Sequence, residues 1–117
     1  MPDHYREKTI LLFEQRRARA AAFHPHQDIF HDHAWDLLLL LFIAYERAEA
    51  VSIGLAATST GGRDASALRW LQALEERGLV TQVGRHKPVE LEGRFTLTHS
   101  AVESMLRYLD GLATMIM

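Results

Sequence analysis

Three polar side chains recur at every third position in the segment from Asp64 to Arg77. Ser66, Arg69 and Gln72 carry a hydroxyl, a guanidinium and an amide group, which hydrogen-bond to base edges and phosphates of nucleic acids. On a helix this spacing places them on one face, and the apolar residues of the segment fall on the other: Ala67, Leu68, Leu71 and Leu74. A helix divided in this way predicts recognition of double-stranded DNA.

Arg69 is the residue of this face best suited to read sequence, because an arginine can donate two hydrogen bonds to a guanine, worth about 1–3 kcal/mol of discrimination. The alternative is an exposed arginine that pairs with Glu76 or contacts a phosphate. Arg63 and Ser66 lie at the start of the expected helix, whose partial positive charge favours phosphate. Capping and solvation are the alternative for both. Trp70 is expected to pack in the core rather than to stack on bases.

A second group of polar and basic side chains, Arg85, His86 and Lys87, lies in the polar stretch from Gly84 to Pro88. The segments on either side of it, Leu79 to Val83 and Arg94 to Leu97, alternate like strands and predict a hairpin. The tip is expected to contact DNA, and the alternative is a loop that its charge keeps soluble.

Four histidines, His24, His26, His31 and His33, fall within ten residues and have Asp28 and Asp32 between them. Imidazole and carboxylate groups are suitable ligands for zinc or nickel. On a helix, however, the members of a His-x-His pair point apart, and polar connectors are often rich in histidine. We therefore expect no metal and no cofactor, and keep these histidines only as candidates.

Composition indicates an ordinary soluble globular protein, with 117 residues, 48% hydrophobic and 24% charged residues and no cysteine. The start, Met1 to Tyr5, lacks the pattern of a secretory signal, and the longest apolar run, Leu37 to Ala44, is too short for a membrane span. We expect a cytoplasmic protein without membrane contact. The glycine-rich loops and nucleophile or metal motifs of common enzymes are missing from the sequence, so we expect no enzymatic activity.

Charge is distributed unevenly along the chain. The formal net charge is -2, which argues mildly against nucleic acid. Residues 23–62 hold one cation against five anions, whereas residues 63–94 hold six cations against five anions. Any positive surface is therefore local, and DNA binding requires these cations to share one face.

The remaining elements are predicted from apolar spacing and turn residues. Helices are expected over residues 3–22, 34–48, 53–58 and 64–77, followed by a last helix that starts at Thr98 or Ser100. Asp32, Ser52 and Asp64 are the expected N-caps, and Ser100 with Glu103 has the form of a capping box. Gly78 is expected to end its helix in the left-handed conformation.

These elements predict a mainly α fold with a small β-hairpin wing, a winged helix-turn-helix flanked by N- and C-terminal dimerisation helices. We expect one domain over 1–117, with an N-terminal helix and connector (1–33), a winged core (34–98) and a C-terminal helix (99–117). The terminal helices have no obvious place for their apolar faces within so small a core. Pairing with a second copy would cover them and would set two recognition helices about 34 Å apart.

The segment Ala67 to Val80, with its Ala-Leu-Arg-Trp and Leu-Glu-x-x-Gly-Leu-Val patterns, resembles small bacterial regulators of the MarR (multiple antibiotic resistance regulator) type. The resemblance covers residues 34 to 109. It implies a homodimer with residues 64–77 in the major groove and the hairpin at the minor groove or backbone. The chain departs from it in the wing, where Glu90 and Glu92 occupy a stretch in which such regulators often carry an Asp-x-Arg element.

The same resemblance implies a small aromatic effector, for which the candidate lining residues are Phe30, Trp35, Phe42 and Tyr45. An aromatic stripe of this kind belongs to a core more often than to a pocket. A different function is also open: a winged-helix module for protein association without DNA binding, which would use the terminal helices and the apolar helix at 34–48. We expect duplex DNA to be the main partner.

Overall fold

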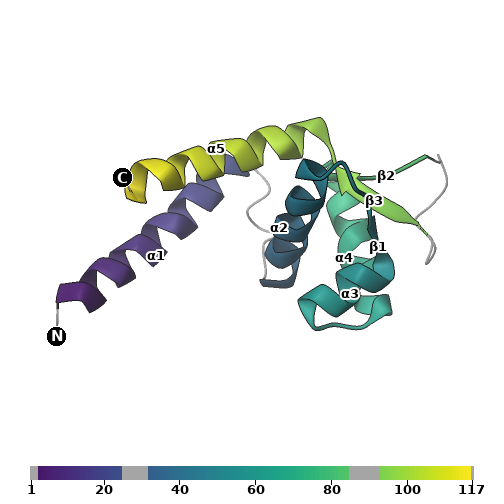
Figure 1. The fold of residues 1–117 in the computed structure, drawn as a ribbon, viewed down its shortest axis with the longest axis horizontal. Coiled ribbons are helices and arrows are strands. Elements are labelled where there is room, and N and C mark those ends of the chain that lie inside the picture. The colour runs from purple at the N-terminus through teal and green to yellow at the C-terminus, as the bar shows by residue number, and fades with distance from the viewer. Residues whose placement is uncertain (1–2, 25–31, 85–92, 117) are drawn as a thin grey trace. The chain divides into compact units, whose positions relative to one another are not determined.

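The computed structural model describes residues 3–24, 32–84 and 93–116, apart from the side chains of residues 3–5, 8, 32 and 113–116. It divides into two compact units (Figure 1). The first comprises Met1–Asp28 and Glu103–Met117, and the second comprises Ile29–Val102. Within the described residues, no helix is long and apolar enough to cross a membrane.

The second unit contains the elements of a winged helix. Three helices, three strands and the beginning of a fourth helix follow in the order α2 (Asp32–Glu46), β1 (Val51–Ser52), α3 (Ile53–Thr60), α4 (Asp64–Glu76), β2 (Val80–Gln82), β3 (Arg94–Leu97) and α5 (His99–Ile116). The predicted mainly α fold with a small hairpin is confirmed. Helix α2 begins and ends two residues earlier than expected.

The three strands form one antiparallel sheet in the order β1-β3-β2. Strand β3 is central: Phe95 pairs with Val51 of β1 on one side and with Gln82 of β2 on the other. The hairpin of β2 and β3 was predicted. Strand β1 was not, because two residues are too few to show an alternating pattern and the strand exists through its pairing with a distant segment.

Each helix and strand of this unit contributes to its core. The largest side chains with an exposed fraction below 2% are Leu37, Leu38, Leu41, Val51, Ile53, Leu71, Leu74, Val80 and Phe95. The sequence of α2 is apolar almost all round, which predicted burial on more than one side, but part of its apolar surface is exposed. Ile43 and Tyr45 remain about half exposed. Leu68, expected in the buried stripe of α4, is only partly buried.

Asp32 and Asp64 were expected as N-caps, but each is the first helical residue of its helix, α2 and α4. Ser52 caps α3 as predicted, and its Oγ accepts a hydrogen bond from the Leu55 amide at 3.1 Å. Helix α4, however, is capped by Arg63, whose backbone is extended, and Asp64 is the first helical residue. For α5 the cap is Thr98, since its hydroxyl accepts the Ala101 N–H at 3.3 Å, while Ser100 lies inside the helix. A cap is set by the backbone conformation, which residue type alone does not determine.

The ends of α3 and α4 are closed by glycines with positive φ. Gly61 has a φ of 74° and Gly78 has a φ of 72°. At the end of α4 the Leu79 amide donates to the Leu74 carbonyl at 3.0 Å and the Gly78 amide donates to Glu75 at 2.9 Å. These two bonds define a Schellman motif, so the prediction for Gly78 is confirmed. Arg77, expected in the last turn, is the C-cap.

Helix α2 ends in the same way but without a glycine. Ala48 has a φ of 55°, and the amide of the next residue, Glu49, donates to the Ala44 carbonyl at 2.9 Å. The left-handed conformation costs an L-residue with a Cβ about 1–2 kcal/mol. Ala48 therefore holds backbone strain at the point where the chain leaves α2 for the sheet.

Replacing this residue, Ala48→Gly, should stabilise the second unit by about 0.5–1 kcal/mol, because relief of the strain outweighs the added freedom of the unfolded chain. Thermal denaturation would show it as a higher Tm. The matched control is Ala50→Gly, since Ala50 is not in the left-handed region and the change there should destabilise. A lower Tm for Ala48→Gly would contradict the inference that the backbone at Ala48 is strained.

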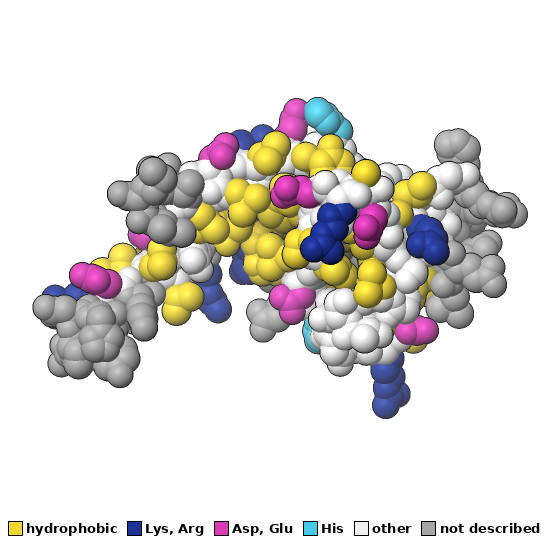
Figure 2. Space-filling model, viewed as in Figure 1, with side chains coloured by type: hydrophobic (Ala, Val, Ile, Leu, Met, Phe, Trp, Pro, Cys, Tyr) yellow, Lys and Arg dark blue, Asp and Glu magenta, His cyan; other side chains and the backbone are white. Residues whose placement is uncertain are grey.

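The first unit is built from α1 (Asp3–Ala22), which has the bounds predicted for it, and residues 103–116 of α5. Arg107 of α5 links the two helices by donating to the Ala22 carbonyl at 3.4 Å, and its guanidinium also donates to the Ser104 hydroxyl of its own helix at 3.0 Å. Burial raises the pKa of the Tyr108 phenol, and the charge of Arg19 partly opposes this. Apolar side chains remain exposed along α1 (Figure 2): Ile10, Leu12 and Phe13.

Candidate nucleic-acid interface

Helix α4 has one buried face and one exposed face, as its sequence predicted. Ala67, Leu71 and Leu74 are buried. On the other side, Arg69 and Gln72 are exposed, and Ser66 is partly exposed. The polar side chains of α4 are therefore available to a partner while the helix is fixed by its apolar residues.

The start of α4 is held in place by a tight turn from α3. The Gly62 amide donates to the Ala57 carbonyl at 3.0 Å, and the Thr60 hydroxyl donates to the Ala56 carbonyl at 2.8 Å. Gly61 supplies the left-handed residue that reverses the chain. Figure 1 shows α3 and α4 on either side of this turn. The pair forms the helix-turn-helix.

A depression of about 270 Å³ lies at the start of α4. Three of the predicted contact residues, Arg63, Ser66 and Arg69, line it together, and Gln72 does not. The turn of α3 contributes backbone and small side chains, and α2 contributes His33 and Leu37. Trp70 also lines the depression and is partly buried, which is consistent with its expected packing role.

The guanidinium groups of Arg63 and Arg69 make no ion pair within the part of the chain that the structure describes. The alternative pairing of Arg69 with Glu76 is therefore not found. Arg63 provides no side-chain hydrogen bond as N-cap, so no cap covers the positive end of the α4 dipole. Asp64 offsets this charge in part, and two arginines with a helix N-terminus still favour an anion.

The strands β2 and β3 form the base of the predicted wing. The Val83 amide extends the pairing by donating to the Arg94 carbonyl at 2.8 Å, and Gly84 follows with a φ of 78°. The predicted contact residues Arg85, His86 and Lys87 lie outside the described residues, as do Glu90 and Glu92. Their contribution to DNA binding stays a prediction.

Two of the four candidate histidines belong to the described residues. His24 and His33 are exposed, while His26 and His31 lie outside the described residues. Among residues 3–24, 32–84 and 93–116, no group of three or more metal-ligating side chains comes together. His33 instead lines the depression at α4, a position that its sequence context did not predict.

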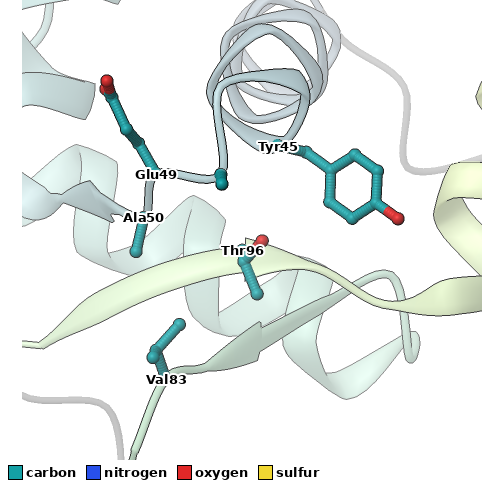
Figure 3. A pocket seen from close by; sticks show the side chains of 6 residues that line it. Tyr45, Glu49, Ala50, Val83 and Thr96 are labelled. Atoms are coloured by element: carbon teal, nitrogen blue, oxygen red, sulfur yellow. The ribbon is translucent and has the colours of Figure 1, made fainter.

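The aromatic side chains proposed for an effector separate into different environments. Phe42 is buried, and its ring stacks at a centroid distance of 6.3 Å on Tyr45, which is 45% exposed. Trp35 is partly buried, and Phe30 lies outside the described residues. Tyr45 lines a pocket of about 410 Å³ beside the sheet (Figure 3). No local sequence pattern signals this pocket, because residues 45–50 form it together with Val83 and Thr96, which lie far away in the chain.

Solved structures share this fold. Rv1404 from Mycobacterium tuberculosis matches 93% of this chain and 68% of its own, with a TM-score of 0.72 at 15% sequence identity. MepR from Staphylococcus aureus, bound to ethidium bromide, matches over 99% and 79%, with a TM-score of 0.69 at 12% identity. The chain has the MarR-type winged helix-turn-helix fold. No protein-family model and no curated protein sequence matches it.

A third structure with the MarR-type fold is that of BpsR from Bordetella bronchiseptica, whose DNA binding is regulated by 6-hydroxynicotinic acid. It matches 97% of this chain and 77% of its own, with a TM-score of 0.50 at 15% identity. At such identities the likeness is one of fold. In the MarR-type fold of this chain, α3 and α4 are the helix-turn-helix, and β2 with β3 is the base of the wing.

Proposed function

We propose that the protein is a homodimeric transcriptional regulator that binds double-stranded DNA in a sequence-specific way. The observation that carries the proposal is the start of α4, where Arg63 and Arg69 line one depression without an ion pair among the described residues. Their helix is anchored by buried Leu71 and Leu74. A rigid helix with unpaired arginines on its exposed side suits the major groove.

Each contact residue has a distinct role in this proposal. Arg69 and Gln72 reach base edges, which specify the sequence. Arg63 and Ser66 bind phosphate at the helix start, which fixes the register of the helix on the duplex. The wing tip, Arg85 to Lys87, adds further phosphate contacts and therefore affinity.

A second copy of the chain completes the regulator. The first unit leaves Ile10, Leu12 and Phe13 of α1 about 50–60% exposed, together with Leu106 of α5 at 47%. A monomer seldom leaves so many large apolar side chains on two neighbouring helices in water. A twofold dimer would cover them and present two α4 helices to successive major grooves, about 34 Å apart.

The similar proteins support this assignment. MepR is a transcription regulator of a multidrug efflux pump, and the DNA binding of BpsR is regulated by a small molecule. A regulator with the same fold and an exposed polar face on α4 is the function in best agreement with both observations. By the same comparison, a small aromatic effector is a candidate partner.

Gel-shift titration of the DNA upstream of the protein's own gene tests the proposal. The change Arg69→Ala should weaken binding by about 5-fold to 150-fold, since a bidentate arginine contact is worth about 1–3 kcal/mol. The control is Arg47→Ala, which removes the same charge from an exposed position at the end of α2, outside the depression. Equal affinities for the two variants would overturn the assigned role of α4.

The second candidate function is protein association, favoured by the exposed apolar side chains of α1 and by the net charge of -2. If the wild-type protein fails to bind any duplex at low salt but still forms dimers in sedimentation experiments, this function replaces the first.

A further inference from the structure

A hollow in the second unit lies away from α4, at the root of the wing. This wing-root pocket has a volume of about 410 Å³. Its walls come from the end of α2 and the segment after it, and from the hairpin: Tyr45, Ala48, Glu49, Ala50, Val83 and Thr96. The volume falls within the range of small-molecule sites, about 300–1,000 Å³.

The residues that line the wing-root pocket are more apolar than those that line the depression at α4. Ala48, Ala50 and Val83 give it an apolar floor, and Tyr45 adds an aromatic ring that is 45% exposed. Figure 3 shows Tyr45 on one side of the pocket and Glu49 with Ala50 on the other, with Thr96 between them, and the Glu49 carboxylate points away from Thr96 and Val83. Glu49 is the single charged group among the described lining residues.

We propose that the wing-root pocket binds a small organic cation that carries one apolar ring. The ring would lie on the alanines and Val83, where it removes apolar surface from water. The ammonium group would lie at the rim on the Glu49 side, where the exposed Glu49 side chain can turn its carboxylate toward it and form an ion pair, and the ring would extend toward Tyr45 on the opposite side. An anion of the same size would meet the carboxylate and no compensating cation among the described walls.

The position of the pocket links such a ligand to the wing. Val83 directly follows β2, and Thr96 lies in β3, so both sides of the hairpin contribute to it. On the other side, Ala48 joins the strained end of α2 to β1. A ligand that touches both sides would hold the base of the hairpin against α2. This consequence rests on the proposed DNA-binding function, whereas the binding of the cation does not.

The first experiment tests binding without DNA. Methyl resonances of alanine, valine and threonine would be followed by NMR while benzyltrimethylammonium is added to the full chain. Saturable shifts are expected at Ala48, Ala50, Val83 and Thr96. Benzoate and benzyl alcohol, which have the ring but not the positive charge, should bind more weakly. Shifts centred elsewhere, or equal binding of benzoate, would overturn the proposal.

Two variants on the same helix end make the test specific. Glu49→Gln should raise the Kd by about 1.4-fold to fivefold, the range expected for an exposed ion pair. Glu46→Gln removes the same charge from an exposed residue that does not line the pocket, and should leave the Kd unchanged. An unchanged Kd for Glu49→Gln would count against the assigned site.

A second experiment addresses the link to the wing. DNA affinity would be measured with and without a saturating concentration of benzyltrimethylammonium, at constant ionic strength. A change of DNA affinity that is lost in Glu49→Gln supports the link. An unchanged affinity would overturn the link but not the binding site, and failure to bind any DNA would instead contradict the proposed function.

Discussion

The change Phe95→Ala should destabilise the second unit by about 3–5 kcal/mol. Phe95 is fully buried in β3, the central strand, and pairs with residues of both neighbouring strands. Loss of the ring leaves a cavity where the sheet meets the helices, in addition to the lost burial of apolar surface. Because small domains are stable by about 5–15 kcal/mol, the variant should lie near the limit of folding.

Urea denaturation followed by tryptophan fluorescence would measure this effect, since Trp35 and Trp70 both belong to the second unit. Thr81→Ala is the matched control: Thr81 is exposed in the neighbouring strand β2, and its loss should cost less than about 1 kcal/mol. If both variants unfold at the same urea concentration, Phe95 is not the centre of this core.

DNA affinity should fall about a thousandfold or more between 50 and 200 mM salt. The proposal places three cations of each protomer on phosphate, Arg63, Arg85 and Lys87, and Arg69 adds a fourth in complexes where it contacts phosphate instead of a base edge. A dimer would then neutralise about 6–8 phosphates, and the logarithm of the binding constant should fall with the logarithm of salt at a slope of about -5 to -7. Fluorescence anisotropy at a series of salt concentrations would give this slope.

One variant separates this electrostatic contribution from sequence reading. Arg63→Gln should make the slope shallower by about two for the dimer and should weaken specific and unspecific duplexes alike. Arg47→Gln should leave the slope unchanged. A slope near zero for the wild type would remove the electrostatic argument for DNA binding altogether.

The sequence predicted the elements whose signals are local. Helix α1 has the predicted bounds, and the apolar spacing in α4 identified Ala67, Leu71 and Leu74 as its buried side. Strand β1 and the true cap of α4 were missed. The strand depends on pairing with a distant segment, and the cap depends on a backbone conformation. The residue types near each of them are therefore not enough to predict either one.

The candidate site shows the same division. A spacing of three residues was enough to place Ser66 and Arg69 on one side of a helix. The depression between them was not predictable, since His33 and Leu37 reach it from another helix. The wing-root pocket was even less predictable from the local sequence, because its walls combine Tyr45 to Ala50 with Val83 and Thr96, which come more than thirty residues later.

The hydroxyl of Thr98 joins two helix ends that are twenty residues apart, as it donates to the Gly78 carbonyl at 2.7 Å while its amide donates to Leu79 at 3.0 Å. The hairpin between these residues is thus closed at its base by its own hydrogen bonds. Insertions or deletions between β2 and β3 need not disturb the end of α4 or the start of α5, and longer loops add little closure entropy. Evolution can therefore vary the length of this hairpin independently of the helix that we propose reads the DNA.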